Sequence, residues 1–146
     1  MPPRKNIVQC KWIYKTKIAA NGTTTNYKNQ LVSKEKSQVH GLDYNETFAL
    51  VARMDSIRLF LAIATSNRWE VHHMDVKSVF LHGDMEEEIY MRHLEGYIED
   101  SSVVCKLRKS LYGLKQAPRA WYPKMDAFLM SQNFERCISD ANVYMQ

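Results

Sequence analysis

The sequence predicts an α+β fold in which helices accompany a mostly antiparallel sheet. Three observations predict this class: a strand pattern around an Asn-Gly turn near the N-terminus, a helical pattern in the middle, and a second helical pattern near the C-terminus. The chain has 146 residues and no internal repeat or linker rich in proline, glycine or serine. We therefore expect one domain.

The first predicted element is a β-hairpin. Residues 10–18 alternate in polarity, with Trp, Ile, Tyr and Lys at every second place, and predict a strand with one wet face. Asn21-Gly22 is a strong signal for a hairpin turn, and residues 23–32 supply the returning strand. Residues 33–50 show no regular pattern.

A helix is predicted next, beginning at Asp55-Ser56. Apolar residues follow at helical spacing, so we expect one buried face. These residues are Ile57, Phe60, Leu61 and Ala64.

The second half of the chain is predicted to alternate strands with turns before a final helix. Residues 69–76 predict a strand that ends at Asp75, and residues 77–82 a short turn or single helical turn stopped by Gly83. Residues 88–91 and 103–107 predict two further strands. The second helix is predicted from Pro118, a residue favoured at the first helical position, to about Gln132.

Charge is distributed unevenly along the chain. The net charge is +4, but residues 1–40 carry eight bases and one acid, residues 41–100 five bases and twelve acids, and residues 101–146 seven bases and three acids. This layout suggests a surface for a polyanion beside a site that holds cations, and ordinary solvated faces are the alternative.

Composition excludes several classes of protein. The longest apolar run has six residues, 59–64, which is too short to span a membrane, and the N-terminus has no apolar stretch typical of a secretory signal. The three cysteines form no Cys-x-x-Cys pair, which argues against a disulfide framework and for reduced thiols. We expect a soluble intracellular chain.

Two segments contain candidate chemistry. Asp75 ends the predicted strand, where its carboxylate can help to hold Mg²⁺, although an aspartate there can equally cap the following turn. Residues 105–122 interleave bases with aromatic side chains around Gly113. Bases pair with phosphates, and aromatic rings either stack on nucleobases or fill the core.

At this point the chain resembles a known family, the reverse transcriptases of copia-type long-terminal-repeat retrotransposons. The resemblance extends from about residue 11 to residue 144, and its most specific part is the run SLYGLKQAPRAWY at residues 110–122. The other matching stretches are KWIYK at 11–15, YK at 27–28, LV at 31–32, GLDYNETF at 41–48, MDVK at 74–77, FLHGD at 80–84 and EEIYM at 87–91.

The resemblance implies the fingers and the first part of the palm of a right-hand polymerase. Residues 1–50 would form the fingers hairpin and loop, and residues 51–146 the palm and remaining fingers. Asp75 would bind two catalytic Mg²⁺ ions, helped by the backbone carbonyl of Val76. Phe80 would lie under the sugar of the incoming deoxynucleotide, and Gln116 beside its 3′ side. The reaction would be attack of a primer 3′-oxygen on the α-phosphate.

The resemblance also implies the partners and the location. The partners would be an RNA or DNA template–primer and deoxynucleotides, with Lys28, Lys115 and Arg119 contacting nucleic acid. The location would be cytoplasmic, in a virus-like particle, without a membrane.

The chain also departs from the family pattern. The family has a Tyr-x-Asp-Asp hairpin. The 146 residues of the chain contain no Asp-Asp pair, so we expect a copy truncated before that motif. Gln30 replaces an arginine of the fingers strand, and Pro123 falls inside the second predicted helix, where proline costs about 3 kcal/mol. We therefore expect the isolated chain to be inactive. A nucleic-acid-binding module without catalysis and an inert product of a decayed element are the alternatives.

Overall fold

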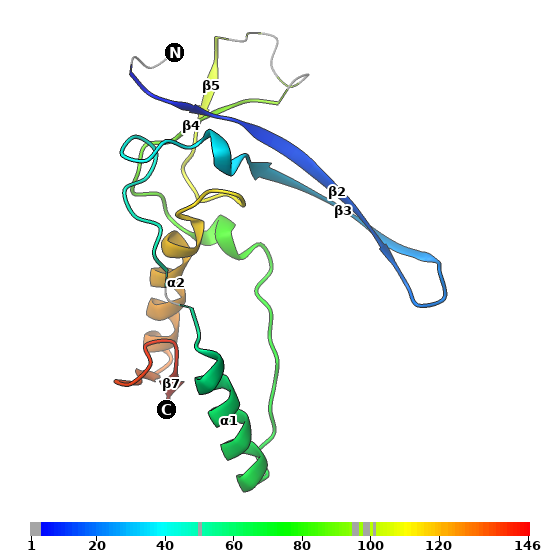
Figure 1. Ribbon diagram of the computed structural model, residues 1–146, viewed down its shortest axis with the longest axis vertical. Coiled ribbons are helices and arrows are strands. Elements are labelled where there is room, and N and C mark those ends of the chain that lie inside the picture. The colour runs from blue at the N-terminus through cyan, green and yellow to red at the C-terminus, as the bar shows by residue number, and fades with distance from the viewer. Residues whose placement is uncertain (1–3, 50, 95–96, 98–99, 101) are drawn as a thin grey trace.

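The computed structural model describes residues 4–49, 51–94, 97, 100 and 102–146. The described residues contain two α-helices, and their strand pairs are mostly antiparallel, so the predicted α+β class is confirmed. Figure 1 shows a long ribbon of strands that leaves the upper part of the molecule, with the helices lying below it. No helix among these residues is both long and apolar enough to cross a bilayer.

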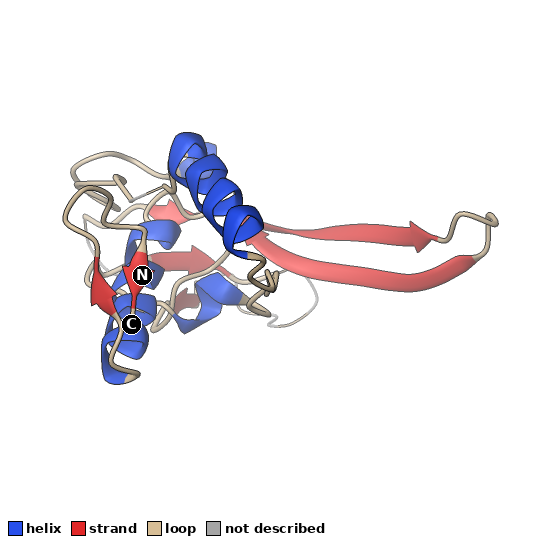
Figure 2. Cartoon of the chain, turned by 90° about the horizontal axis from the view of Figure 1, so that it is seen from below, coloured by secondary structure: helices blue, strands red, loops and turns tan. Residues whose placement is uncertain are grey.

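The predicted hairpin is present and projects away from the rest of the molecule (Figures 1 and 2). Strands β2 (Cys10–Ile18) and β3 (Thr24–Ser33) pair in antiparallel register from Cys10 opposite Ser33 to Ile18 opposite Thr24. Gly22 has a φ of +81°, which glycine adopts without steric cost, and this explains why the Asn-Gly pair marks the turn. We call this hairpin, residues 10–33, the arm.

The core lies where a small sheet meets the second helix. The sheet has the order β1 (Ile7–Val8), β4 (Tyr90–Arg92) and β5 (Val104–Lys106), with β1 parallel and β5 antiparallel to β4. The predicted strands at 88–91 and 103–107 are thus confirmed with shifted ends, whereas β1 is too short for its pattern to be recognised. The buried cluster consists of Val8, Ile89, Leu114 and Ala117.

Helix α1 (Met54–Asn67) forms where the sequence predicts it, but its apolar face is not buried. Ile57, Phe60 and Leu61 remain 41%, 50% and 45% exposed, and within the described chain only Ala64 of this helix is buried. The predicted buried face is therefore wrong. The spacing of apolar residues creates the stripe, but burial also requires a second element, and none of the described elements packs closely on it.

The predicted strand at residues 69–76 is wrong as well. These residues connect α1 to the short 3₁₀ helix η2 (Val79–His82) as an exposed segment without strand pairing in the described chain. A strand forms only when a neighbour accepts its backbone hydrogen bonds, and alternation alone supplies no neighbour. The predicted turn at 77–82 and its stop at Gly83 are confirmed by η2.

Helix α2 (Ala117–Ser131) confirms the second predicted helix and contains Pro123 in its interior. Its N-terminal half packs against η2 so closely that a Cβ on Gly83 would lie 2.8 Å from the backbone carbon of Ala120. A small hairpin of β6 (Glu135–Arg136) and β7 (Tyr144–Met145) follows. Its Tyr144 hydroxyl donates a hydrogen bond to Asp126 of α2 at 2.8 Å.

Candidate nucleotide and nucleic-acid site

The loop at residues 110–116 joins the base of the arm to helix α2. The Ser33 N–H at the end of β3 donates to the Tyr112 carbonyl at 2.7 Å. Gly113 follows with a φ of +83°, and a Cβ there would lie 2.2 Å from the Ser33 carbonyl oxygen. Only glycine fits this approach between two backbone segments. The run SLYGLKQAPRAWY therefore holds the arm and α2 together.

A buried polar network lies directly behind this loop. Gln116 is 2% exposed; its side-chain oxygen accepts from Gln38 Nε2 at 3.0 Å, and its Nε2 donates to the Asp43 carbonyl at 2.9 Å. Gln38 Oε1 in turn accepts from the Lys115 N–H at 2.8 Å. Buried amide groups need such partners, so Gln38 fixes the orientation in which Gln116 is held.

Two bases beside this network are tied to the loop at residues 44–46. Lys115 Nζ donates to the Tyr44 hydroxyl at 3.0 Å and lies 5.0 Å from the centre of its ring. That hydrogen bond raises the pKa of Lys115. Arg119 lies 3.6 Å from the Glu46 carboxylate. Both cations are therefore positioned at the surface next to Gln116.

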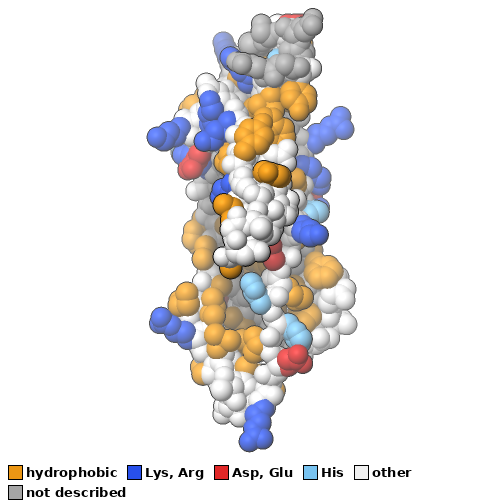
Figure 3. Space-filling view, turned by 90° about the vertical axis from the view of Figure 1, so that its right-hand side faces the viewer, with side chains coloured by type: hydrophobic (Ala, Val, Ile, Leu, Met, Phe, Trp, Pro, Cys, Tyr) orange, Lys and Arg blue, Asp and Glu red, His pale blue; other side chains and the backbone are white. Residues whose placement is uncertain are grey.

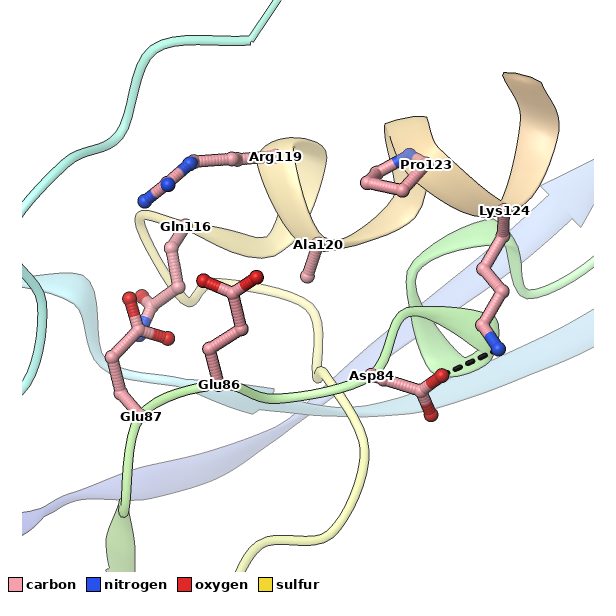
Figure 4. Close-up of a pocket in the computed structure, with 8 residues that line it drawn as sticks. All are labelled: Asp84, Glu86, Glu87, Gln116, Arg119, Ala120, Pro123 and Lys124. Atoms are coloured by element: carbon pink, nitrogen blue, oxygen red, sulfur yellow. Dashed lines mark ion pairs between the residues drawn. The ribbon is translucent and has the colours of Figure 1, made fainter. Parts of the chain in front are cut away.

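A pocket of about 220 Å³ opens at the start of α2, with acids on one side and bases on the other (Figure 4). Its lining residues are Asp84, Glu86, Glu87, Gln116, Arg119, Ala120, Pro123 and Lys124. The acids come from the segment after η2, and the bases project from α2. The Asp84 carboxylate forms ion pairs with both Lys109 and Lys124. The hydrogen bonds from these two lysines lower the pKa of the Asp84 carboxyl to about 2.

Phe80 lies between the core and the loop. It belongs to η2, is partly buried, and packs against the core cluster. Its ring meets the ring of Tyr112 edge to face, with centroids 5.0 Å apart. The contact with Tyr112 thus positions Phe80 against the loop that also contains Gly113.

Asp75 and Val76 lie apart from this pocket. Both are exposed in the extended segment after α1, and neither lines the pocket. In the described part of the chain, no three His, Cys, Asp or Glu side chains are grouped closely enough to hold a metal ion. The expected position of Asp75 at a sheet edge depended on the strand that is absent here.

Lys28, the remaining predicted contact, lies far out on the arm. It is exposed on β3 directly opposite Lys15 of β2. The structure therefore brings together Gln116, Lys115 and Arg119. It packs Phe80 against the core and Tyr112, and it leaves Asp75, Val76 and Lys28 on separate segments.

The sequence reasoning missed Gln38, Asp43 and Tyr44. They belong to residues 33–50, where no periodic pattern exists. Their role depends on contacts with residues more than 70 positions away, as the Gln38–Gln116 bond shows. The one available signal was the matching stretch at residues 41–48, which contains Asp43 and Tyr44 but not Gln38.

Comparisons with known proteins agree with the predicted resemblance. The family model described as "Reverse transcriptase (RNA-dependent DNA polymerase)" matches residues 1–146. The chain is 47% identical to the retrovirus-related Pol polyprotein from transposon TNT 1-94 of Nicotiana tabacum, over 100% of the chain and 11% of the relative. It is 40% identical to the Pol polyproteins from transposons RE2 and RE1 of Arabidopsis thaliana, over 99% of the chain and 10% of each relative.

These relatives are much longer than the chain, which spans about a tenth of their length. No solved structure matches it. The family match covers every residue, and the three relatives named above are copia-type Pol polyproteins of plant transposons. The chain therefore belongs to the reverse transcriptase (RNA-dependent DNA polymerase) family.

Proposed function

We propose that the chain forms the fingers and the first part of the palm of the RNA-directed DNA polymerase of a retrotransposon Pol polyprotein. Residues 1–50 would be the fingers hairpin and loop, and residues 51–146 the palm and the remaining fingers. The observation that carries this proposal is the loop at residues 110–116. The most specific part of the resemblance is also the part that joins the arm to α2 and borders the polar pocket.

The described residues do not by themselves fit a pair of Mg²⁺ ions. Two divalent ions need several carboxylates, and Asp75 is exposed without two further ligands beside it. We propose Asp75, with the backbone carbonyl of Val76, as one contribution to a metal site whose other ligands lie elsewhere in a Pol polyprotein. This requirement explains why the 146-residue chain alone should be inactive.

The nucleotide would be bound near the pocket at the start of α2. Phe80 is proposed to limit the space under the sugar, and its edge-to-face contact with Tyr112 supports a fixed ring position. Gln116 is proposed to lie beside the nucleotide. Because both ends of its amide are bonded to Gln38 and Asp43, Gln116 would act from a fixed position in the pocket wall.

Phosphate contacts are proposed for Lys28, Lys115 and Arg119. The arm carries four lysines and no acid over residues 10–33, so its electrostatic potential favours a polyanion. Binding through such contacts releases counterions and weakens steeply as salt rises.

A nucleic-acid-binding module without catalysis is the second candidate. The basic arm supports it, because lysines can bind phosphates without a metal ion. The third candidate is an inert product of a decayed element. A single cooperative unfolding transition of the purified chain would argue against the inert product.

Primer extension with Mg²⁺ and deoxynucleotides tests the proposal. The 146-residue chain should give no extension, whereas a chimera with the polypeptide that follows the matched region in the tobacco relative should extend the primer. In that chimera Asp75→Ala should abolish extension, and Asp55→Ala, which removes an exposed aspartate of α1, should not. Phe80→Ala should relax discrimination against ribonucleotides.

Two results would contradict the proposal. Extension by the chimera that survives Asp75→Ala would place the metal site elsewhere. A chimera that folds and binds primer–template but never extends would favour the binding module instead.

A further inference from the structure

Three polar side chains lie buried behind the loop at residues 110–116. Lysine and arginine side chains project from the surface of the molecule, as Figure 3 shows for one face. Gln38, Asp43 and Gln116, by contrast, are only 7%, 2% and 2% exposed. Buried polar groups are hydrogen-bonded in folded proteins, and the chemistry of each partner decides whether a group must donate or accept. The groups at the two ends of this network therefore determine the direction of every hydrogen bond in it.

Two backbone groups fix the polarity of the network. At one end the Lys115 N–H, which can only donate, bonds to Gln38 Oε1 at 2.8 Å. At the other end the Asp43 carbonyl, which can only accept, bonds to Gln116 Nε2 at 2.9 Å. Between them Gln38 Nε2 donates to Gln116 Oε1 at 3.0 Å. Because neither backbone group can exchange its role, neither side-chain amide can turn over without the loss of two of these three bonds.

The backbone at Asp43 is itself held in place by the Asp43 side chain. Its Oδ2 accepts from the Val39 N–H at 2.6 Å and from Asn6 Nδ2 at 2.5 Å. Asn6 Nδ2 also donates to the Ser37 carbonyl at 2.7 Å. Asn6 precedes β1 and does not line the pocket at the start of α2. The network therefore extends from the residues before β1 to the wall of that pocket.

This network leaves a defined pair of groups on Gln116 for a ligand. Gln116 lines the pocket, and Figure 4 shows its side chain turned toward the side that carries Glu86 and Glu87. Within the described chain, the bonds to Gln38 and Asp43 occupy one proton of Nε2 and one lone pair of Oε1, so one of each remains. A side chain that is already ordered binds a ligand more tightly, because it loses no rotamer freedom on binding.

We propose that Gln38 and Asp43 are positioning residues for the nucleotide: they fix which end of the Gln116 amide donates and which accepts in the pocket, and Asn6 anchors Asp43. This inference rests on the proposed function, because that function places the nucleotide beside Gln116. It adds three residues that do not line the pocket and whose effect on the nucleotide passes through Gln116.

The isosteric variant Gln38→Glu tests the polarity of the network. An ionised carboxylate accepts from the Lys115 N–H but cannot donate to Gln116, whereas a protonated carboxyl does both, as the parent amide does. Burial raises the pKa of such a carboxyl toward neutral pH. In primer extension by the chimera, the KM for deoxythymidine triphosphate should rise about fivefold at about pH 8 with kcat unchanged, and it should return toward the parent value at about pH 6.

Two further variants complete this experiment. Gln132→Glu is the matched control, because it makes the same change on an exposed side chain at the end of α2, and its KM should equal that of the parent at both pH values. Gln38→Met offers neither a donor nor an acceptor, so its KM should be raised equally at both pH values. It also carries the test if circular dichroism shows that Gln38→Glu does not fold at the higher pH, and a parent-like KM for it would then overturn the inference.

A double-mutant cycle tests the anchor at Asn6. Asn6→Ala should raise the KM by about threefold to fivefold in the parent chimera, because one hydrogen bond to Asp43 is lost. In the Gln116→Met background the same substitution should have no further effect. In NMR spectra of the 146-residue chain, Asn6→Ala should shift the side-chain amide signals of Gln116 and leave those of Gln132 unchanged.

Two outcomes would overturn the inference while the proposed function survives. A KM for Gln38→Glu that has the same ratio to the parent at both pH values would mean that the polarity of residue 38 does not reach the nucleotide. Additive effects of Asn6→Ala and Gln116→Met would mean that Asn6 acts through general stability. A parent chimera that never extends a primer would instead contradict the proposed function, and the role in nucleotide binding would fall with it even if the NMR signals confirm the hydrogen bonds.

Discussion

The loop at residues 110–116 and the region at residues 54–76 differ in how fully their side chains and backbone groups find partners. The loop touches β3, the Gln38 network and the core, and Leu114 and Gln116 are almost fully buried. The other region keeps an apolar helix face exposed and leaves residues 69–76 without a strand partner in the described chain. The sequence signals were strong in both, so a local pattern alone does not ensure packing.

The largest expected effect tests the close approach at the loop. Gly113→Ala should lower the free energy of unfolding by more than about 4 kcal/mol, because the new Cβ would overlap the Ser33 carbonyl oxygen. Gly41→Ala is the matched control: its φ is +80°, but nothing lies within 4 Å of the new atom. It should cost only about 1–2 kcal/mol from the left-handed backbone. Urea denaturation measures both free energies of unfolding. Equal losses for Gly113→Ala and Gly41→Ala would show that residue 113 does not lie close to the Ser33 carbonyl in solution.

A pair of leucine truncations compares the two regions directly. Leu114→Ala should destabilise the chain by about 2–5 kcal/mol, because Leu114 is 4% exposed in the core. Leu61→Ala on the apolar face of α1 should cost less than about 1 kcal/mol, because this side chain is 45% exposed. The shift of the urea midpoint, with the m-value unchanged, measures the destabilisation in each variant. A large loss from Leu61→Ala would mean that the face of α1 is buried after all.

Pro123 lies inside α2, the helix that follows the loop at residues 110–116. Pro123→Ala should raise the free energy of unfolding by about 2–3 kcal/mol, because alanine restores an amide hydrogen bond and removes the ring clash. Thermal melts provide the measurement. An unchanged midpoint would show that α2 begins after Pro123 in solution.

The smallest effect concerns pH. Lys106, then Lys5, hold the pKa of the Glu88 carboxyl at about 2, below its ordinary value of 4.5. A lowered pKa in the folded state stabilises the fold above pH 4.5, and this contribution is lost as pH falls toward 2. The thermal midpoint of Glu88→Gln should therefore lie slightly below that of the parent at pH 6 and converge with it near pH 2. A gap that stays constant across this range would contradict the ion pairs.

How much of the fold could be predicted depended on how far apart the interacting residues lie. The arm and both α-helices follow from local chemistry: an Asn-Gly turn and helical spacing. The strand at residues 69–76 and the buried face of α1 required partners that the local pattern does not contain. Alternation identifies two faces of a segment, but only a neighbouring backbone makes it a strand.

The same distinction holds for the candidate site. Gln116 was singled out because it belongs to a specific motif, whereas Gln38, which holds it, belongs to a segment without any pattern. Their contact spans 78 positions and depends on the fold of the arm base. The roles proposed for Asp75, Val76, Phe80, Gln116, Lys28, Lys115 and Arg119 stay predictions for the functional experiments.

Native-state amide hydrogen exchange tests most directly whether the two regions differ in this way. The amides of Ser110 and Ala120 donate to Gly83 and Gln116 carbonyls at 2.9 Å and should exchange slowly. The amides of residues 70–76, which have no backbone partner in the described chain, should exchange at nearly unprotected rates. Equal protection of both segments would contradict the account, because it would show that residues 70–76 are paired within the 146-residue chain.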